Sequence, residues 1–122
     1  MGEITSGNVK DITGNRGWFI GNFIEDEKFN SDEFEVKWAS CRKGWTKGSV
    51  EASMNAKTMC ILISGKFLFK FPEENKKRII DKEGDFVFWS PGTWYESEAL
   101  EDSVLLVIRW PSIPGDKKKM AK

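Results

Sequence analysis

The chain has 122 residues, and its 19 basic and 19 acidic residues cancel to a formal net charge of zero. This length suits a single domain with its own core, and the balanced charge argues against nucleic acid or a membrane surface as a partner. No apolar run approaches the ~20 residues of a membrane-spanning helix, and the polar start at 1–6 lacks the apolar stretch of a secretion signal. We therefore expect a cytoplasmic protein.

In chain order, residues 1–15 carry no regular pattern and are predicted to form a mobile N-terminal segment. Residues 16–24 are the first strand candidate. Residues 33–39 then alternate charged and apolar side chains, which predicts a strand with one buried face. The side chains predicted to lie on that buried face are Phe34, Val36 and Trp38.

The second half of the chain continues the strand pattern. Residues 59–63 and 104–108 are continuous apolar runs, typical of strands covered on both faces. A hairpin is predicted at Ser64-Gly65, and 66–71 alternates again. About eight short strands with this spacing, and no helical stripe, predict an all-β sandwich or small barrel. The lysine-rich end, 115–122, is predicted to be a mobile basic tail. The predicted core aromatics of 66–71 are Phe67, Phe69 and Phe71.

The two cysteines, Cys41 and Cys60, fall in different predicted strands. No C-x-x-C motif and no Cys/His cluster accompanies them, which argues against a structural zinc site. In a reducing compartment the expected state of both is a free thiol.

The segment 84–95 has the most distinctive pattern, with an opening Gly84, a turn at Pro91-Gly92 and an aromatic residue at Tyr95. It resembles the second motif of the cupin superfamily, G(X)5PxG(X)2H, with Tyr95 at the place of the metal-binding histidine. The resemblance implies an RmlC-like jelly roll, a small antiparallel β-barrel, with a single cupin domain over 16–114.

The first cupin motif, G(X)5HxH(X)3–4E(X)6G, is matched only at its closing Gly65. Counting back from that glycine, Thr58 takes the place of the metal-binding glutamate, and Glu51 and Ser53 fall near the two histidines. The chain contains no histidine, and imidazole is the ligand that holds iron, manganese, nickel or zinc in such barrels. The resemblance therefore implies the scaffold without its metal, and we expect no metal or other cofactor.

Residues 84–89 and 107–116 together resemble a group of small cupin proteins, some of which carry the label "signal peptidase I". That activity needs a membrane anchor and a Ser-Lys nucleophile pair. The sequence shows no anchor and no serine within an activating motif. A peptidase activity is therefore not expected, and whether the chain is an enzyme stays open.

Inward-facing strand positions line the mouth of a cupin barrel, and the resemblance puts two adjacent aromatic residues of the second motif there. Aromatic walls with a few polar groups bind flat or sugar-like small molecules. Arg42 shares the strand parity of Trp38, so it either clamps a carboxylate or phosphate inside the barrel or forms a salt bridge at the rim. The candidate ligand-binding residues are Tyr95, Trp94, Trp38, Arg42, Glu51 and Thr58.

Three functions are compatible with this pattern. We favour a metal-independent binding protein for an unknown small molecule, with an aromatic-lined pocket. The second is a metal-free enzyme of the sugar-nucleotide isomerase or epimerase type, with Tyr95 and Glu51 as acid and base. The third is a structural or interaction protein whose barrel is filled by its own aromatic side chains. A homodimer across the strand at 16–24 is also expected, because exposed strand edges tend to pair.

Overall fold

A computed structural model describes residues 2–12 and 16–120. These residues form one short 3₁₀ helix, η1 (Val9–Ile12), and ten strands. None of the described residues belongs to a helix long and apolar enough to cross a membrane. The strands are β1 (Trp18–Ile20), β2 (Glu35–Cys41), β3 (Glu51–Ser53), β4 (Lys57–Ser64), β5 (Phe67–Phe71), β6 (Lys76–Ile80), β7 (Phe86–Trp89), β8 (Glu96–Ala99), β9 (Ser103–Trp110) and β10 (Lys117–Lys119).

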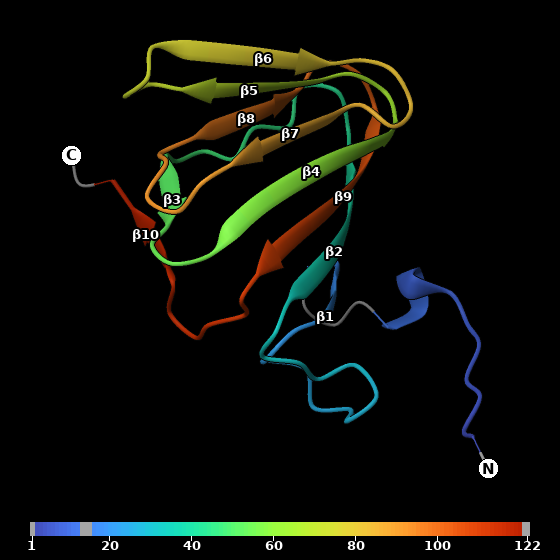
Figure 1. Cartoon of the computed structure of the whole chain (residues 1–122). Coiled ribbons are helices and arrows are strands. Elements are labelled where there is room, and N and C mark those ends of the chain that lie inside the picture. The colour runs from blue at the N-terminus through green and yellow to red at the C-terminus, as the bar shows by residue number, and fades with distance from the viewer. Residues whose placement is uncertain (1, 13–15, 121–122) are drawn as a thin grey trace.

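The strands pair antiparallel in a jelly-roll arrangement (Figure 1). A five-stranded sheet has the order β1-β2-β9-β4-β7, a three-stranded sheet has the order β6-β5-β8, and β10 pairs with β3. The predicted all-β fold is therefore confirmed. The long strands β2, β9 and β4 lie side by side in the five-stranded sheet, and the three-stranded sheet around β5 faces that sheet.

The predicted hairpin at Ser64-Gly65 is wrong, because β4 and β5 belong to different sheets. Gly65 has a φ of 98°, a conformation that favours glycine. A Cβ at this position would collide with the Asp102 carbonyl oxygen and the Ser103 hydroxyl. The glycine thus passes the chain from one sheet to the other beneath the start of β9.

Aromatic rings fill the part of the interior between β5, β7 and β8. The ring of Phe69 lies 5.3 Å from that of Phe67 and 5.6 Å from that of Trp89, and Trp89 lies 4.4 Å from Tyr95. The three phenylalanines of β5 are buried, as predicted. The buried cluster comprises Ala39, Cys60, Leu62, Phe67, Phe69, Phe71, Ile80, Val87, Trp89, Tyr95, Ala99 and Leu105.

The predicted orientation of β2 is wrong by one residue. Glu35 and Ala39 are buried, Lys37 and Cys41 are partly buried, and Phe34 is 38% exposed. A one-residue change of parity turns every side chain of a strand to the other face. The inner face of β2 is therefore partly charged. Its outer face continues an apolar row across the five-stranded sheet, in the register Trp38, Leu106, Ile61 and Phe86.

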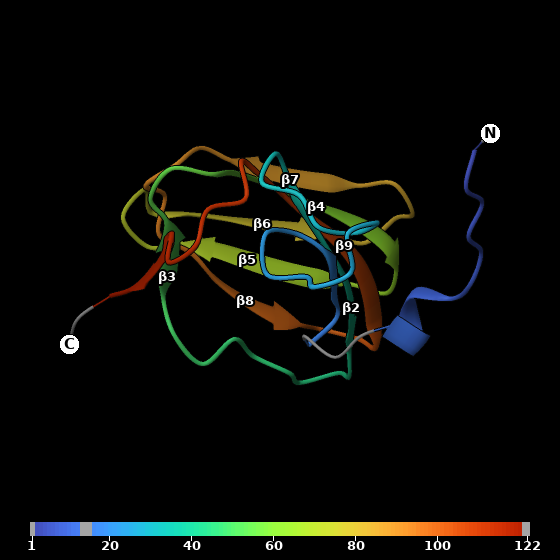
Figure 2. The same ribbon diagram turned by 90° about the horizontal axis from the view of Figure 1, so that it is seen from below.

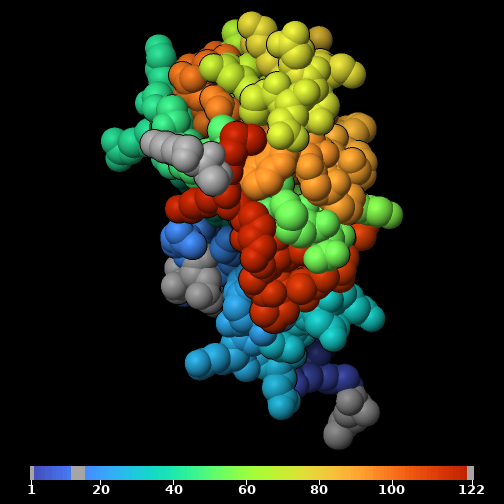
Figure 3. All heavy atoms as spheres, turned by 90° about the vertical axis from the view of Figure 1, so that its left-hand side faces the viewer, coloured from blue at the N-terminus to red at the C-terminus, as the bar shows by residue number. Residues whose placement is uncertain are grey.

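The C-terminal segment also differs from the prediction of a mobile basic tail over 115–122. Lys117 and Lys119 pair with Ser53 and Glu51 of β3, and the Asp116 carboxylate accepts hydrogen bonds from the backbone of Asn55 and Ala56. Figure 2 shows β10 beside β3, and Figure 3 shows the C-terminal segment lying against the body of the molecule. The ladder and the aspartate anchor hold this segment in place.

At the other end, residues 9–12 of the predicted mobile segment 1–15 form η1, while residues 1 and 13–15 lie outside the described residues, as do 121–122. The domain bounds of 16–114 stay a prediction, to which β10 is an addition. Both cysteines are free thiols, as expected.

Candidate functional site

A cavity of about 1270 Å³ lies between the inner faces of the sheets. Its apolar side is formed by Cys60, Phe67, Phe69 and Leu105. Seven basic and three acidic side chains border it, so its lining carries an excess of positive charge. The basic side chains are Lys10, Arg16, Lys37, Lys47, Arg109, Lys117 and Lys119, and the acidic ones are Glu35, Glu51 and Asp116.

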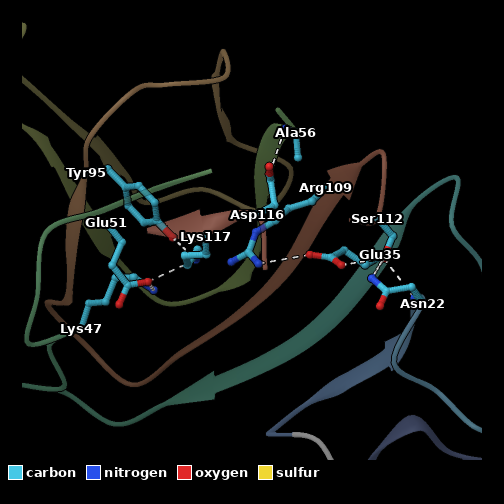
Figure 4. Close-up of polar contacts among 10 residues, drawn as sticks. All are labelled: Asn22, Glu35, Lys47, Glu51, Ala56, Tyr95, Arg109, Ser112, Asp116 and Lys117. Carbon is cyan, nitrogen blue, oxygen red and sulfur yellow. Dashed lines mark hydrogen bonds and ion pairs between the residues drawn. The ribbon is translucent and has the colours of Figure 1, made fainter. Parts of the chain in front are cut away.

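Glu51 on β3 is the centre of one polar group in this cavity (Figure 4). The Ser49 hydroxyl donates to its Oε2 at 2.7 Å, while the Nζ atoms of Lys47 and Lys117 lie 3.4 and 3.5 Å from its Oε1. Its backbone exchanges hydrogen bonds of 3.0 and 2.8 Å with Tyr95. These contacts fix the carboxylate between two lysines.

Tyr95 completes this group. Its Oη accepts a hydrogen bond of 2.7 Å from Lys117 Nζ, and the Nζ atoms of Lys47 and Lys117 each lie 5.2 Å from its ring centroid. The tyrosine is 5% exposed and its ring packs on Trp89. The aromatic core therefore holds the phenol that in turn positions the Lys117 amine.

A second polar group lies along β2 and β9. Arg109 forms an ion pair of 3.2 Å with Glu35, whose other oxygen accepts a hydrogen bond of 2.7 Å from the Ser112 hydroxyl. Asn22 Nδ2 donates to that hydroxyl at 2.7 Å. The guanidinium also lies 4.6 Å from the ring centroid of Trp18. Arg109 Nε is buried without a hydrogen-bond partner among the described residues, so the arginine keeps an unused donor.

The basic side chains influence one another's protonation. Burial lowers the pKa of Lys37, and the charges of Lys47 and Arg109 lower it further. Burial, with Arg109 and Lys47 nearby, lowers the pKa of Lys117 to about 6. Burial also opposes the charge of Lys47, but Tyr95 and Glu51 outweigh it and raise the pKa of that lysine. At pH 7 Lys47 thus carries the charge that pairs with Glu51, and the Lys117 amine is mainly neutral.

Burial and neighbouring charges also shift the pKa values of the acidic, phenol and thiol groups of the cavity. Burial opposes the charge of Glu51, but the hydrogen bond from Ser49 and the charge of Lys47 outweigh it and lower its pKa. Burial raises the pKa of the Tyr95 phenol and raises that of the Cys60 thiol to about 12. Near neutral pH the site therefore holds an ionised Glu51, a protonated phenol and an unreactive thiol.

The residues that stand where the cupin motifs carry their metal ligands do not fit a transition metal. The described part of the chain holds no group of three histidine, cysteine or acidic side chains that could bind one. Glu51 is already paired with two lysines, and Thr58 offers only a hydroxyl. The surrounding ammonium and guanidinium groups would also repel a cation.

The structure brings together two of the six predicted site residues, Tyr95 and Glu51. Thr58 also points inward, but it lies in the core at 1% exposure, does not border the cavity, and its Oγ1 has no partner among the described residues. Trp94 is half-buried and does not border the cavity either. Neighbouring Tyr95 takes the inward position, and a ligand-binding role for Trp94 stays a prediction.

The predicted inward orientation of the other two residues, Trp38 and Arg42, rests on the strand parity of β2, which is wrong by one residue. Trp38 borders the cavity, but strand alternation places its side chain opposite those of Lys37 and Ala39. Its indole nitrogen is buried without a described partner. Arg42 is exposed beyond the end of β2 and does not border the cavity. It cannot act as the inward clamp considered for it.

Most residues of the charged site are not predicted by the sequence pattern. Lys37 and Glu35 alternate with the apolar residues of β2, and that alternation is the one signal that could have identified them. Lys117 lies in the segment interpreted as a tail. Arg109 was visible as a charge at the end of an apolar run, but nothing in the sequence paired it with Glu35. Lys47 precedes its partner Glu51 by four residues in a loop.

Comparison with known proteins supports the fold but does not identify a function. No protein-family model matches the chain, and no curated protein matches it significantly in sequence. Many solved structures do match. An uncharacterised protein with a double-stranded β-helix domain from Klebsiella pneumoniae has a TM-score of 0.64 at 15% identity, over 75% of this chain and 74% of its own.

Two further structures extend the comparison. An RmlC-like cupin protein from Desulfovibrio desulfuricans has a TM-score of 0.58 at 17% identity, over 68% of this chain and 76% of its own. Pac13, described as a nucleoside dehydratase and solved from Streptomyces also with uridine, has a TM-score of 0.63 at 12% identity, over 74% of this chain and 70% of its own. Together with the jelly-roll topology, these likenesses show that the chain has the fold of the cupin superfamily.

Proposed function

We propose that this protein binds a small organic anion, a carboxylate or a phosphate, inside its jelly roll without using a transition metal. The observation that carries the proposal is the excess of basic side chains around the cavity. Glu51 pairs with Lys47 and Glu35 pairs with Arg109. Of the other two basic groups that face the interior, the Lys117 amine is mainly neutral at pH 7, and Lys37 has no carboxylate partner among the described residues. A buried charge without a partner is costly, so an anionic ligand would stabilise this arrangement.

Lys37 and Arg109 are the groups best placed to receive the anion. Lys37 Nζ lies 5.7 Å from the Trp18 ring centroid and has no carboxylate partner among the described residues. Arg109 borders the cavity with a side chain that is 13% exposed. Arginine and lysine bind carboxylates and phosphates through charge-assisted hydrogen bonds. The apolar side formed by Phe67, Phe69 and Leu105 suits the body of a flat or sugar-like molecule.

The volume of the cavity helps to choose among a binding protein, a structural protein and an enzyme. A barrel filled by its own side chains would lack a space of about 1270 Å³, so binding is favoured over a purely structural role. Cupin-fold neighbours that are enzymes include the nucleoside dehydratase Pac13 and the DMSP lyase DddQ from Ruegeria pomeroyi, of which this chain covers 44%. An enzymatic role is therefore the second candidate, and the contact of Tyr95 and Glu51 with the same amine favours it.

The proposal includes a cytoplasmic location and a homodimer. Two free thiols suit a reducing compartment. β1 is an edge of the five-stranded sheet, and an unpaired strand edge can pair with that of a second copy. Light scattering at micromolar concentration should give a mass above the 14.0 kDa of one chain. A mass equal to one chain would refute the dimer and leave the binding proposal intact.

Calorimetric titration with inorganic phosphate and with succinate tests the binding proposal. Lys37→Gln and Arg109→Gln each remove one cation from the cavity and should weaken binding about tenfold or more, since a hydrogen bond to a charged group contributes ~1.5–3 kcal/mol. Lys70→Gln changes an exposed lysine of β5 and is the matched control. Binding that is absent, or equal in all variants, would refute the proposal.

A further inference from the structure

The Lys117 amine lies in the cavity between the Tyr95 phenol and the Glu51 carboxylate, which it shares with Lys47. Its Nζ lies 2.7 Å from Tyr95 Oη and 3.5 Å from Glu51 Oε1, and the side chain is 24% exposed. Lys117 borders the cavity, so the amine can be reached by a bound molecule. Its neighbour Lys118 is exposed on the other side of β10.

The surroundings of Lys117 favour the neutral amine. A single carboxylate, Glu51, serves both Lys47 and Lys117, and Arg109 adds a third positive charge nearby. Figure 4 shows Arg109 beside Lys117, on the side away from Tyr95. A lysine that is desolvated and placed next to other cations is the arrangement that activates an amine as a nucleophile. The low pKa of Lys117, about 6, agrees with this.

We propose that Lys117 is a nucleophile that forms an imine with a carbonyl compound carrying an anionic group, such as an oxo acid. The inference rests on the proposed function, because the anionic group would be bound by Lys37 and Arg109 while the carbonyl carbon meets Lys117. Neither cysteine competes for this role, since burial raises the pKa of both thiols and keeps them protonated.

The step balances with the side chains present. The Lys117 Nζ lone pair attacks the carbonyl carbon, the π pair of the C=O bond moves to oxygen, and that oxygen takes a proton from Tyr95 Oη. The phenolate then recovers a proton from the nitrogen. In the second half the nitrogen lone pair expels the hydroxyl group, which leaves as water with the Tyr95 proton. The Tyr95 phenolate then takes the remaining proton from the iminium nitrogen, which leaves the neutral imine and restores the phenol. The sum is amine plus carbonyl giving imine plus water, with no oxidant or reductant.

Each neighbour of Lys117 has a part in this step. The pKa of Tyr95 is raised by burial, so the phenol carries its proton at neutral pH and can donate it. Glu51 lies within 3.5 Å of the nitrogen and is ionised. It therefore stabilises the positive charge that develops when the imine is protonated. Lys47 keeps Glu51 ionised without becoming the nucleophile, because the pKa of Lys47 is raised.

Trapping with glyoxylate tests the proposal. Glyoxylate is an aldehyde with one carboxylate, small enough for a cavity of this volume, and sodium cyanoborohydride reduces its imine to carboxymethyl-lysine. At pH 7 and limiting glyoxylate, peptide mapping should find Lys117 modified about tenfold or more faster than any other lysine, since its neutral fraction is far larger. Excess inorganic phosphate should slow this labelling, because it occupies the anion site.

Two matched variants complete the experiment, with thermal melts as the folding control. Lys118→Arg should leave the labelling unchanged, and Lys117→Arg should abolish the dominant site while other lysines react as before. Equal labelling of all exposed lysines would overturn the imine proposal. If phosphate binds by calorimetry while Lys117 shows no preference, only the imine inference fails. If Lys117 dominates and phosphate neither binds nor competes, the imine stands and the proposed anion site fails.

Discussion

The interior of this protein has two halves with opposite chemistry. Between β5, β7 and β8 it is packed with Phe67, Phe69 and Trp89. Between β2, β9 and β10 it holds a charged cavity around Glu35 and Glu51. The packed half stabilises the fold through burial, whereas burial in the charged half is costly unless every charge has a partner. This difference is the physical basis of the proposed anion site.

The largest expected effect comes from emptying the packed half. Phe69→Ala removes a ring that is 2% exposed and contacts both Phe67 and Trp89, and should lower the free energy of unfolding by about 3–5 kcal/mol. The matched change in the charged half is Lys37→Met, which replaces a desolvated ammonium with an apolar chain. Chemical denaturation should show the second variant equal to or more stable than the wild type.

Tyr95→Phe tests the boundary between the halves. The ring stays in place against Trp89, but the Lys117 amine loses its 2.7 Å partner. The amine keeps its contact with Glu51 at 3.5 Å, so the loss is that of one hydrogen bond, about 0.5–1.5 kcal/mol, and the melting temperature should fall. Trp94→Ala, at a half-buried residue off the cavity, should cost less than Phe69→Ala. A larger loss for Trp94 than for Phe69 would contradict the two-half account.

The dependence of stability on pH sharpens the comparison. The pKa of Lys117 is about 6 in the folded protein, below its usual 10.5. Between these values the unfolded chain binds a proton that the folded protein does not, so the free energy of unfolding rises with pH, by at most about 1.4 kcal/mol per pH unit for one group. Lys37 acts in the same direction and Lys47 in the opposite one.

The Lys117→Met variant isolates this contribution. Between pH 6 and pH 9 the free energy of unfolding, measured by chemical denaturation, should rise less with pH in the variant than in the wild type. The free energies of the two proteins should differ most at pH 6. Lys118→Met, at the exposed neighbour, should keep the wild-type slope. Equal slopes in wild type and Lys117→Met would show that Lys117 is protonated in the folded protein and would remove the electrostatic support for its nucleophilic role.

The sequence predicted the fold better than the site because strand patterns are local and the site is not. The alternation in β5 correctly indicated the phenylalanine face, and Gly84 to Tyr95 indicated the cupin fold and an inward Tyr95. The same alternation in β2 was assigned to the wrong face, since an apolar row is expected to be buried and here it lies outside. A binary pattern cannot show which face meets a polar cavity.

Lys117 and Arg109 illustrate the remaining limit. Lys117 belongs to a run of three lysines that is indistinguishable from a solvated tail until β10 is seen to pair with β3. The partner of Arg109 lies 74 residues away, and no local spacing encodes that contact. Both residues become part of a site only through long-range strand register.

Calorimetry on metal-free protein tests the central claim most directly. Untagged protein, treated with a chelator and checked by elemental analysis, is titrated with inorganic phosphate at pH 7 in two buffers of different ionisation enthalpy. We predict binding that does not depend on metal and is accompanied by proton uptake, because a bound anion raises the pKa of Lys117. Binding that appears only after iron, manganese, nickel or zinc is restored would contradict a metal-independent anion site.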